Sequence, residues 1–177
     1  KAKNVQRAFL GAMETQMQIG CYPSETGSPA DLTERERTEL QTAYTSRVEQ
    51  YYTEENPCRK RYIALNEDFL TACDSDVEYS ESGGVADCRF DSVRLYADRM
   101  TAVVQAQTLV WDKRISGNPE QGFSVELPVN RDTITATMKK ENGVWKLDSI
   151  DSQISLSAAV PADDEVCRER YPTFETA

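Results

Sequence analysis

The spacing of apolar residues changes once along this 177-residue chain. Up to about residue 72 apolar side chains recur every third or fourth position, and from about residue 86 they recur every second position. The first period is typical of one-sided helices and the second of strands. Strands that follow one another without crossover helices pair antiparallel. The sequence therefore predicts an α+β fold, with N-terminal helices packed on a curved antiparallel sheet of four strands or slightly more.

Local signals set the expected helix ends. Three helices are predicted, with bounds at about 4–19, 34–53 and 57–72. Thr33 and Glu36 form a Ser/Thr-x-x-Glu capping box, which favours a helix that begins at the next residue after Thr33. Asn56 before Pro57 fits an N-cap followed by the first position of a helix. Gly20 supplies a left-handed residue after the first helix.

The second part of the chain predicts strands. Four are expected, with bounds at about 86–96, 100–113, 129–140 and 144–153. The last two are joined by Asn142-Gly143, a pair that favours the primed turn of a tight hairpin. We expect residues 1–156 to form one domain. Residues 157–177 are expected to form an acidic tail that wraps the surface or links onward.

Charge restricts the classes of partner. The formal net charge is -10 and the sequence pI is about 4.6, and the Lys and Arg residues are scattered along the chain. Such a surface repels nucleic-acid phosphate, so no nucleic acid is expected as a partner. No apolar run approaches the ~20 residues that a membrane helix requires, so no membrane span is expected in this chain.

Five cysteines and no histidine limit the chemistry further. Without His or Cys-x-x-Cys pairs the usual structural zinc sites cannot form, and disulfides or buried thiols remain. Cys73 and Cys88 bracket an acidic stretch and are one possible disulfide, while Cys21 with Cys167 is a rival pairing. The cysteines favour an oxidising compartment.

The acidic stretch from Asp74 to Asp91 predicts a surface loop or an exposed sheet edge. Its first acidic residues imitate half of a calcium loop, because they place carboxylates at alternate positions. Tyr79 replaces the glycine of such a loop, and Val85 replaces its bidentate glutamate. No metal and no cofactor is therefore expected.

Two segments of the strand region resemble a known superfamily. They are "CRFDSVRLYADRMTAVVQAQTLVWDK" and "RDTITATMKKENGVWKLDSI", and the second ends in a hairpin of the Gly-x-Trp-Lys type. With the preceding helices, they resemble the cystatin-like, NTF2-like superfamily, and more narrowly the accessory domains of exported Gram-positive bacterial proteins. The resemblance implies a cone between helices and sheet, and an extracytoplasmic location, either secreted or attached to the cell surface.

Four aromatic residues are the candidates for a ligand-binding lining of that cone: Tyr44, Tyr62, Trp111 and Trp145. Aromatic walls suit amphipathic small molecules, although such residues more commonly belong to the core. Acid-base catalysis would need a carboxyl group that is buried beside a tyrosine, because the chain lacks histidine. The aspartates considered for that role are Asp91, Asp98, Asp132 and Asp148.

Three functions from different classes are consistent with this sequence. The first is a non-catalytic extracytoplasmic accessory or protein-interaction domain, which contacts another protein or a second copy of itself through the sheet face. The second is a small-molecule-binding protein, or an enzyme of the isomerase or cyclase kind, that uses the cone. The third is a scaffold component of a cell-envelope secretion or conjugation system. A fold of this kind does not itself decide between them.

Overall fold

The computed structural model describes residues 1–22, 32–71, 77–118, 120 and 122–158. Its helices are α1 (Ala2–Met17), α2 (Glu34–Tyr51) and α3 (Cys58–Thr71). Its strands are β1 (Val77–Leu95), β2 (Thr101–Asn118), β3 (Gly122–Glu126), β4 (Val129–Glu141) and β5 (Val144–Ala158). All strand pairs are antiparallel, so the predicted α+β class with N-terminal helices is confirmed.

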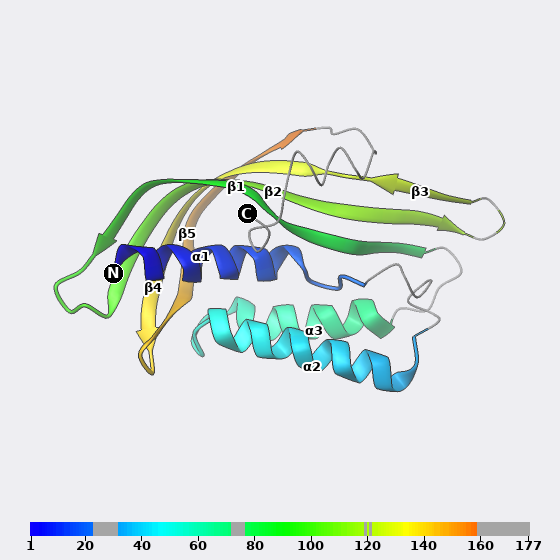
Figure 1. Cartoon of the computed structure of the whole chain (residues 1–177), viewed down its shortest axis with the longest axis horizontal. Coiled ribbons are helices and arrows are strands. Elements are labelled where there is room, and N and C mark those ends of the chain that lie inside the picture. The colour runs from blue at the N-terminus through cyan, green and yellow to red at the C-terminus, as the bar shows by residue number, and fades with distance from the viewer. Residues whose placement is uncertain (23–31, 72–76, 119, 121, 159–177) are drawn as a thin grey trace.

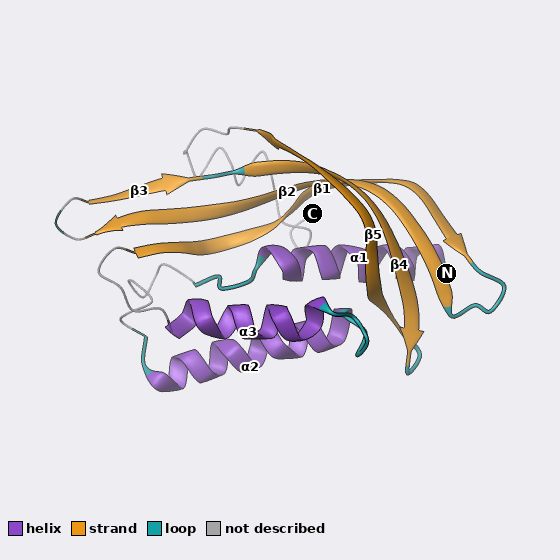
Figure 2. Ribbon diagram, turned by 180° about the vertical axis from the view of Figure 1, so that it is seen from behind, coloured by secondary structure: helices purple, strands orange, loops and turns teal. Residues whose placement is uncertain are grey.

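The molecule is built in layers, with all three helices on one side of the sheet (Figure 1). The strand order is β1-β2-β4-β5, and β3 pairs with the far end of β2. The sheet curves over α1, and α2 and α3 lie side by side below α1, as the reverse view also shows (Figure 2). The other side of the sheet, which we call the outer face, is not covered by any helix of the described chain.

The side-chain alternation of β4 explains how the sheet receives the helices. Ile134, Ala136 and Met138 are buried on the helix side, while the threonines between them point to the outer face. Successive residues of a strand point to opposite sides of a sheet, so a period of two produces one apolar row and one polar row. The apolar row forms the roof of the core.

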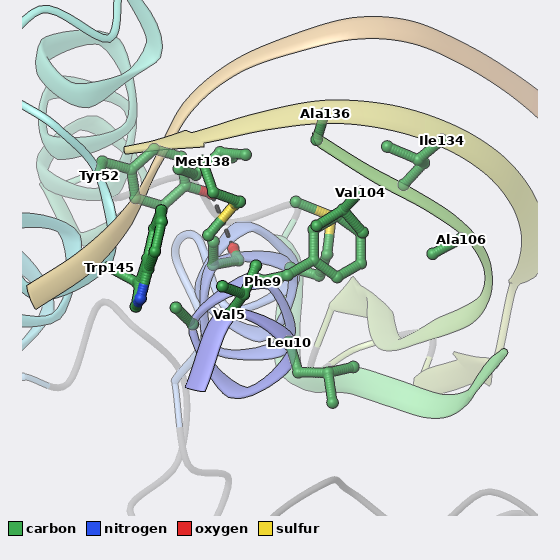
Figure 3. Packing of buried hydrophobic residues seen from close by; sticks show 14 of the residues in the cluster. Val5, Phe9, Leu10, Tyr52, Val104, Ala106, Ile134, Ala136, Met138 and Trp145 are labelled. Carbon is green, nitrogen blue, oxygen red and sulfur yellow. Dashed lines mark hydrogen bonds between the residues drawn. The ribbon is translucent and has the colours of Figure 1, made fainter. Parts of the chain in front are cut away.

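Helix α1 fills the space beneath this roof (Figure 3). Val5 and Phe9 are fully buried, and the Phe9 ring meets that of Phe90 edge-on with centroids 5.8 Å apart. Small side chains such as Ala106 and Ala136 on the strands leave room for the phenylalanine ring. Large and small residues thus alternate across the interface, which is how dense packing without strain is reached.

The second half of α1 approaches β1 closely enough to require glycine. A Cβ atom at Gly83 would overlap the carbonyl oxygen of Met17, and one at Gly84 would lie 2.7 Å from Oε1 of Glu14. The buried Glu14 carboxylate accepts a hydrogen bond of 2.7 Å from the backbone N–H of Val85. The lack of side chains at Gly83 and Gly84 therefore allows α1 to pack directly against β1.

The sheet differs from the sequence prediction at the start of β1, in the presence of β3, and at the ends of β2 and β5, which extend past the predicted ends at about residues 113 and 153 to Asn118 and Ala158. The first strand begins at Val77 instead of about residue 86, because its backbone pairs along the whole of β2 as far as Gly117. From Val77 onward the acidic stretch is thus an edge strand, the second of its two expected forms, while residues 74–76 lie outside the described residues. The sheet also gains β3, a fifth strand within a region predicted to be loop.

The predicted turn and cap signals are confirmed. Asn142 and Gly143 both have positive φ, at 51° and 79°, as a primed hairpin turn requires. Thr33 caps α2 in a complete capping box with Glu36. The side chain of Asn56 accepts a hydrogen bond of 2.9 Å from the N–H of Cys58, at the start of α3.

The packing of Phe9 generates a stability prediction. Replacing a buried phenylalanine by alanine removes its burial and leaves a cavity, so Phe9→Ala should lower the free energy of unfolding by about 3–5 kcal/mol. Phe69 is the matched control, because its side chain is 52% exposed and Phe69→Ala should cost clearly less. Equilibrium denaturation by urea measures both values. Equal losses in the two variants would contradict the described core.

Candidate functional site

The cone between the helices and the sheet is the first place where a functional site was expected. Tyr44 is 3% exposed, and its hydroxyl donates a hydrogen bond of 3.1 Å to the carbonyl oxygen of Thr15. Tyr52 is 1% exposed, and its hydroxyl donates to the carbonyl oxygen of Ala12 over 2.7 Å. Both phenols therefore bond to backbone of α1 within the core.

Burial controls the acidity of these phenols. Removal from water disfavours the phenolate, and it raises the pKa of Tyr44 and of Tyr52 above the ordinary tyrosine value. Desolvation likewise raises the pKa of Tyr62, whose ring meets that of Tyr52 edge-on at 5.5 Å. All three remain protonated at neutral pH, so within the cone they act as hydrogen-bond donors and packing groups.

The two tryptophans lie on opposite sides of the sheet. Trp145 is 7% exposed and belongs to the main core, with the Lys140 ammonium 5.6 Å from its ring centroid. Trp111 packs in a separate cluster with Leu127 and Val129. Its neighbour Val110 points into the main core, so the alternation of β2 turns Trp111 to the outer face.

The structure therefore brings Tyr44, Tyr62 and Trp145 together around the main core and places Trp111 elsewhere. The sequence could not separate these positions, because both faces of the second strand carry apolar residues. A ligand-binding role for the four residues stays a prediction.

The four candidate aspartates have different surroundings. Asp91 is exposed, and so is Asp98, whose pKa is held below its ordinary range chiefly by the backbone N–H of Met100. Asp148 accepts a hydrogen bond of 2.8 Å from the hydroxyl of Thr53 and pairs with the Lys139 ammonium at 3.2 Å. Asp91 thus lies on the edge strand β1, Asp98 lies in a turn, and Asp148 belongs to an ion pair.

Asp132 is the buried aspartate of the set, with 5% of its surface exposed. Its carboxylate accepts a long hydrogen bond of 3.4 Å from the side chain of Gln153. In the pairing of β2 with β4, Thr108 lies directly opposite Asp132. The tyrosine hydroxyls at Tyr44 and Tyr52 donate to backbone instead. An acid-base mechanism would need an aspartate beside a tyrosine. These contacts do not support that arrangement.

Two pockets open on the helical side. One of about 500 Å³ is lined by residues of α2 and α3, among them Arg37, Gln41 and Glu67. The other, of about 360 Å³, is lined by Gln18, Arg47 and residues around them. The first pocket shares no lining residue with the main core, whereas the second borders it, because Tyr44 lines that pocket. Among the residues that the structure describes, no group of three His, Cys, Asp or Glu side chains could hold a metal ion.

The outer face of the sheet carries no helix of the described chain. Strand register and alternation place four rows of side chains there: Arg89, Ser92 and Arg94 from β1; Val103, Gln105 and Gln107 from β2; Thr133, Thr135 and Thr137 from β4; and Ser149, Ser152 and Ile154 from β5. The named side chains of β2, β4 and β5 are hydroxyl, amide and apolar groups, while Arg131 and Lys139 continue the β4 row at its two ends and the Asp151 carboxylate lies beside Thr137. The chain as a whole carries a net charge of -10.

Hydrogen bonds hold parts of the outer face in order. Ser92 donates to the side chain of Gln105 over 2.9 Å, joining β1 to β2. Thr137 donates to Asp151 over 2.7 Å, joining β4 to β5. Ser149 donates to the same carboxylate over 2.8 Å. These side chains combine donors and acceptors on a surface without helix cover, which is suited to contact with another polypeptide.

The sequence signal for this surface was visible as threonine at every second position of the third expected strand. What it could not reveal was that the helices all lie on the other side. No helix in the described parts of the chain has the length and apolar character needed to cross a membrane.

Comparisons with known proteins give one likeness. No protein-family model matches the chain, and no curated protein matches its sequence. Among solved structures the chain is similar to the intermembrane space region of the chloroplast protein ARC6, with 11% sequence identity and a TM-score of 0.47. The alignment covers 90% of this chain and 95% of that one. At this identity and TM-score the likeness carries no argument about function.

Among the described residues, no disulfide joins any two of the three cysteines Cys21, Cys58 and Cys88. Cys73 and Cys167 lie outside the described residues, so the two alternative disulfides stay predictions. Burial raises the pKa of the Cys21 thiol to about 12, and it raises that of the Cys88 thiol to about 12 as well. Neighbouring carboxylates, including Asp112 for Cys21, act in the same direction.

Thiol reactivity tests these surroundings. At pH 8 a pKa near 12 instead of 9.0 leaves far less thiolate, so alkylation of Cys21 and Cys88 by iodoacetamide should be at least about a hundredfold slower in the folded chain than in the unfolded one. The unfolded chain ionises first, so the stabilisation by the protonated thiols is lost as pH rises from 9 toward 12. Peptide mass spectrometry measures the rates. Equal rates in both states would contradict the burial.

Proposed function

We propose that this domain is a non-catalytic protein-interaction module and that its contact surface is the outer face of the sheet. The observation that carries the proposal is the group of uncharged side chains in the middle of the rows on β2, β4 and β5, with Arg131 and Lys139 at the ends of the β4 row and Asp151 beside it, on a face that no helix of the described chain covers. Charged residues are depleted at the centres of protein interfaces, because removing a charge from water costs free energy. On a chain with a net charge of -10, this uncharged group is where another protein can approach without such a cost.

The contents of the cone support the same proposal. Its centre is occupied by packed side chains such as Phe9, Met138 and Tyr52, all at most 1% exposed. The pockets of the helical side are lined by other residues. A binding or catalytic cone of the isomerase or cyclase kind would need that space to be open to a ligand.

The location and relatives of the module are a finer part of the proposal. We infer an extracytoplasmic accessory domain of the cystatin-like, NTF2-like kind from exported Gram-positive bacterial proteins. Support comes from the sequence resemblance of the hairpin around Asn142-Gly143 and from the helix-then-sheet order. A scaffold of a cell-envelope machine is one form that such a module can take.

Site-specific photo-crosslinking tests the surface. Benzoylphenylalanine is placed at Gln105, in the middle of the outer face, and at Gln50, an exposed residue of α2 that serves as the matched control. In cells or extracts of the native source, the Gln105 variant should form a discrete protein adduct after illumination, and the Gln50 variant should not. Adducts of equal yield at both positions, or no adduct at Gln105, would contradict the proposal.

A further inference from the structure

The second half of β5 has an unusual exposure. The six residues from Asp151 to Leu156 are all exposed, although alternate residues of a strand point to opposite faces. Ile154 and Leu156 are 64% and 66% exposed, and they are the most exposed of the large apolar side chains in the described chain. This segment is open on both faces of the sheet, and its hydrogen-bonded neighbour in the strand order is β4 on one side.

Within the described chain, the edge of this segment that faces away from β4 lacks the usual protection. An edge strand presents backbone N–H and C=O groups that can pair with another strand, and proteins commonly guard such edges with charges, proline or bulges. The run from Ser152 to Ala158 contains no charged residue and no proline. Its pairing with β4 is regular, since both register shifts of β5 lie before Ser152.

The opposite edge of the sheet is guarded in two of these ways, by charges and by bulges. β1 carries charged residues along its length, among them Asp87, Arg89 and Asp91. Three register shifts also interrupt its pairing with β2. Of these two edges, the end of β5 is therefore the one better suited to strand addition.

We propose that a second copy of this chain pairs with that edge, so that two β5 strands lie antiparallel across a two-fold axis at Ser155. The proposal rests on the proposed function, and it names the partner and the contact for one edge of the interaction surface. A two-fold interface uses the same surface on both copies, and antiparallel pairing relates two identical strands in that way.

The position of the axis follows from the sequence. The uncharged run from Ser152 to Ala158 is seven residues long, and Ser155 is its midpoint. Pairing centred there matches the run with itself over its full length. It also places Ile154 of each copy opposite Leu156 of the other, so the two most exposed apolar side chains cover each other on the outer face.

Charge favours a second copy at this edge over other modes of self-contact. Two chains that each carry a net charge of -10 repel each other, and the repulsion is smallest where the meeting segments are neutral. The paired edge would continue the sheet from one copy into the other. The uncharged side chains in the middle of the outer face would then belong to one surface across both copies.

Disulfide trapping tests the register in the full chain. Ser155→Cys places two thiols at the axis, within the range that a disulfide spans, whereas Ser152→Cys places them roughly 20 Å apart. Under mild oxidation the Ser155→Cys chain should give a crosslinked dimer in at least about tenfold higher yield, with the 155–155 bond identified by peptide mass spectrometry. Equal yields in the two variants would overturn the register.

Sedimentation equilibrium tests the association itself. The wild-type chain should approach twice its 19.9 kDa mass as concentration rises. The double variant Ile154→Lys and Leu156→Lys brings like charges together across the axis. The dissociation constant of its dimer should therefore be at least about tenfold higher than that of the wild type. Val144→Lys is the control, because Val144 is an exposed apolar residue of β5 outside the run, and its association should be unchanged.

The outcomes separate this inference from the proposed function. A wild-type chain that stays monomeric up to about 1 mM, the weak end of specific affinities, overturns the pairing. So does a dimer that the double lysine variant leaves intact while circular dichroism shows the fold unchanged. If the pairing fails and the Gln105 photo-adduct to another protein persists, the interaction module stands without it. If the adduct is also lost, both fail.

Discussion

The position of α1 between the sheet and the other two helices is the contact on which the rest of the structure depends. Phe9 and its neighbours fill the concave side of the sheet, while the carbonyl oxygens of Ala12 and Thr15 accept hydrogen bonds from Tyr52 and Tyr44 of the helical layer. A buried hydroxyl without a partner costs free energy, so these two bonds fix how closely the second layer approaches. Glu14 fixes the approach to β1 in the same way.

The class of fold could be predicted from the sequence because its signals are local. A period of two in Thr133 to Met138, a capping box at Thr33 and a primed turn at Asn142-Gly143 each depend on a few neighbouring residues. The start of β1 depends instead on pairing with residues more than thirty positions later in the chain. The acidic composition of this segment indicates that it is exposed. Composition alone does not distinguish an exposed sheet edge from a surface loop.

The candidate site was harder to predict for a related reason. Tyr44 and Trp111 look equivalent in the sequence, since each is an aromatic residue within an apolar pattern. Strand phase and the depth of the helical layer separate them, and both are properties of the assembled fold. The need for glycine at Gly83 and Gly84 is likewise a property of the assembled fold, because it arises from the close approach of α1.

The contact of α1 with β5 joins the first element of the chain to the last described one. Such non-local contacts are formed late in folding, because a long loop must close before they contribute. During synthesis, α1 leaves the ribosome well before the strands that cover its apolar face. For much of that time Val5 and Phe9 lack the roof that buries them in the finished molecule. The order of elements along this chain therefore makes its nascent state dependent on protection from aggregation until the final hairpin has been made.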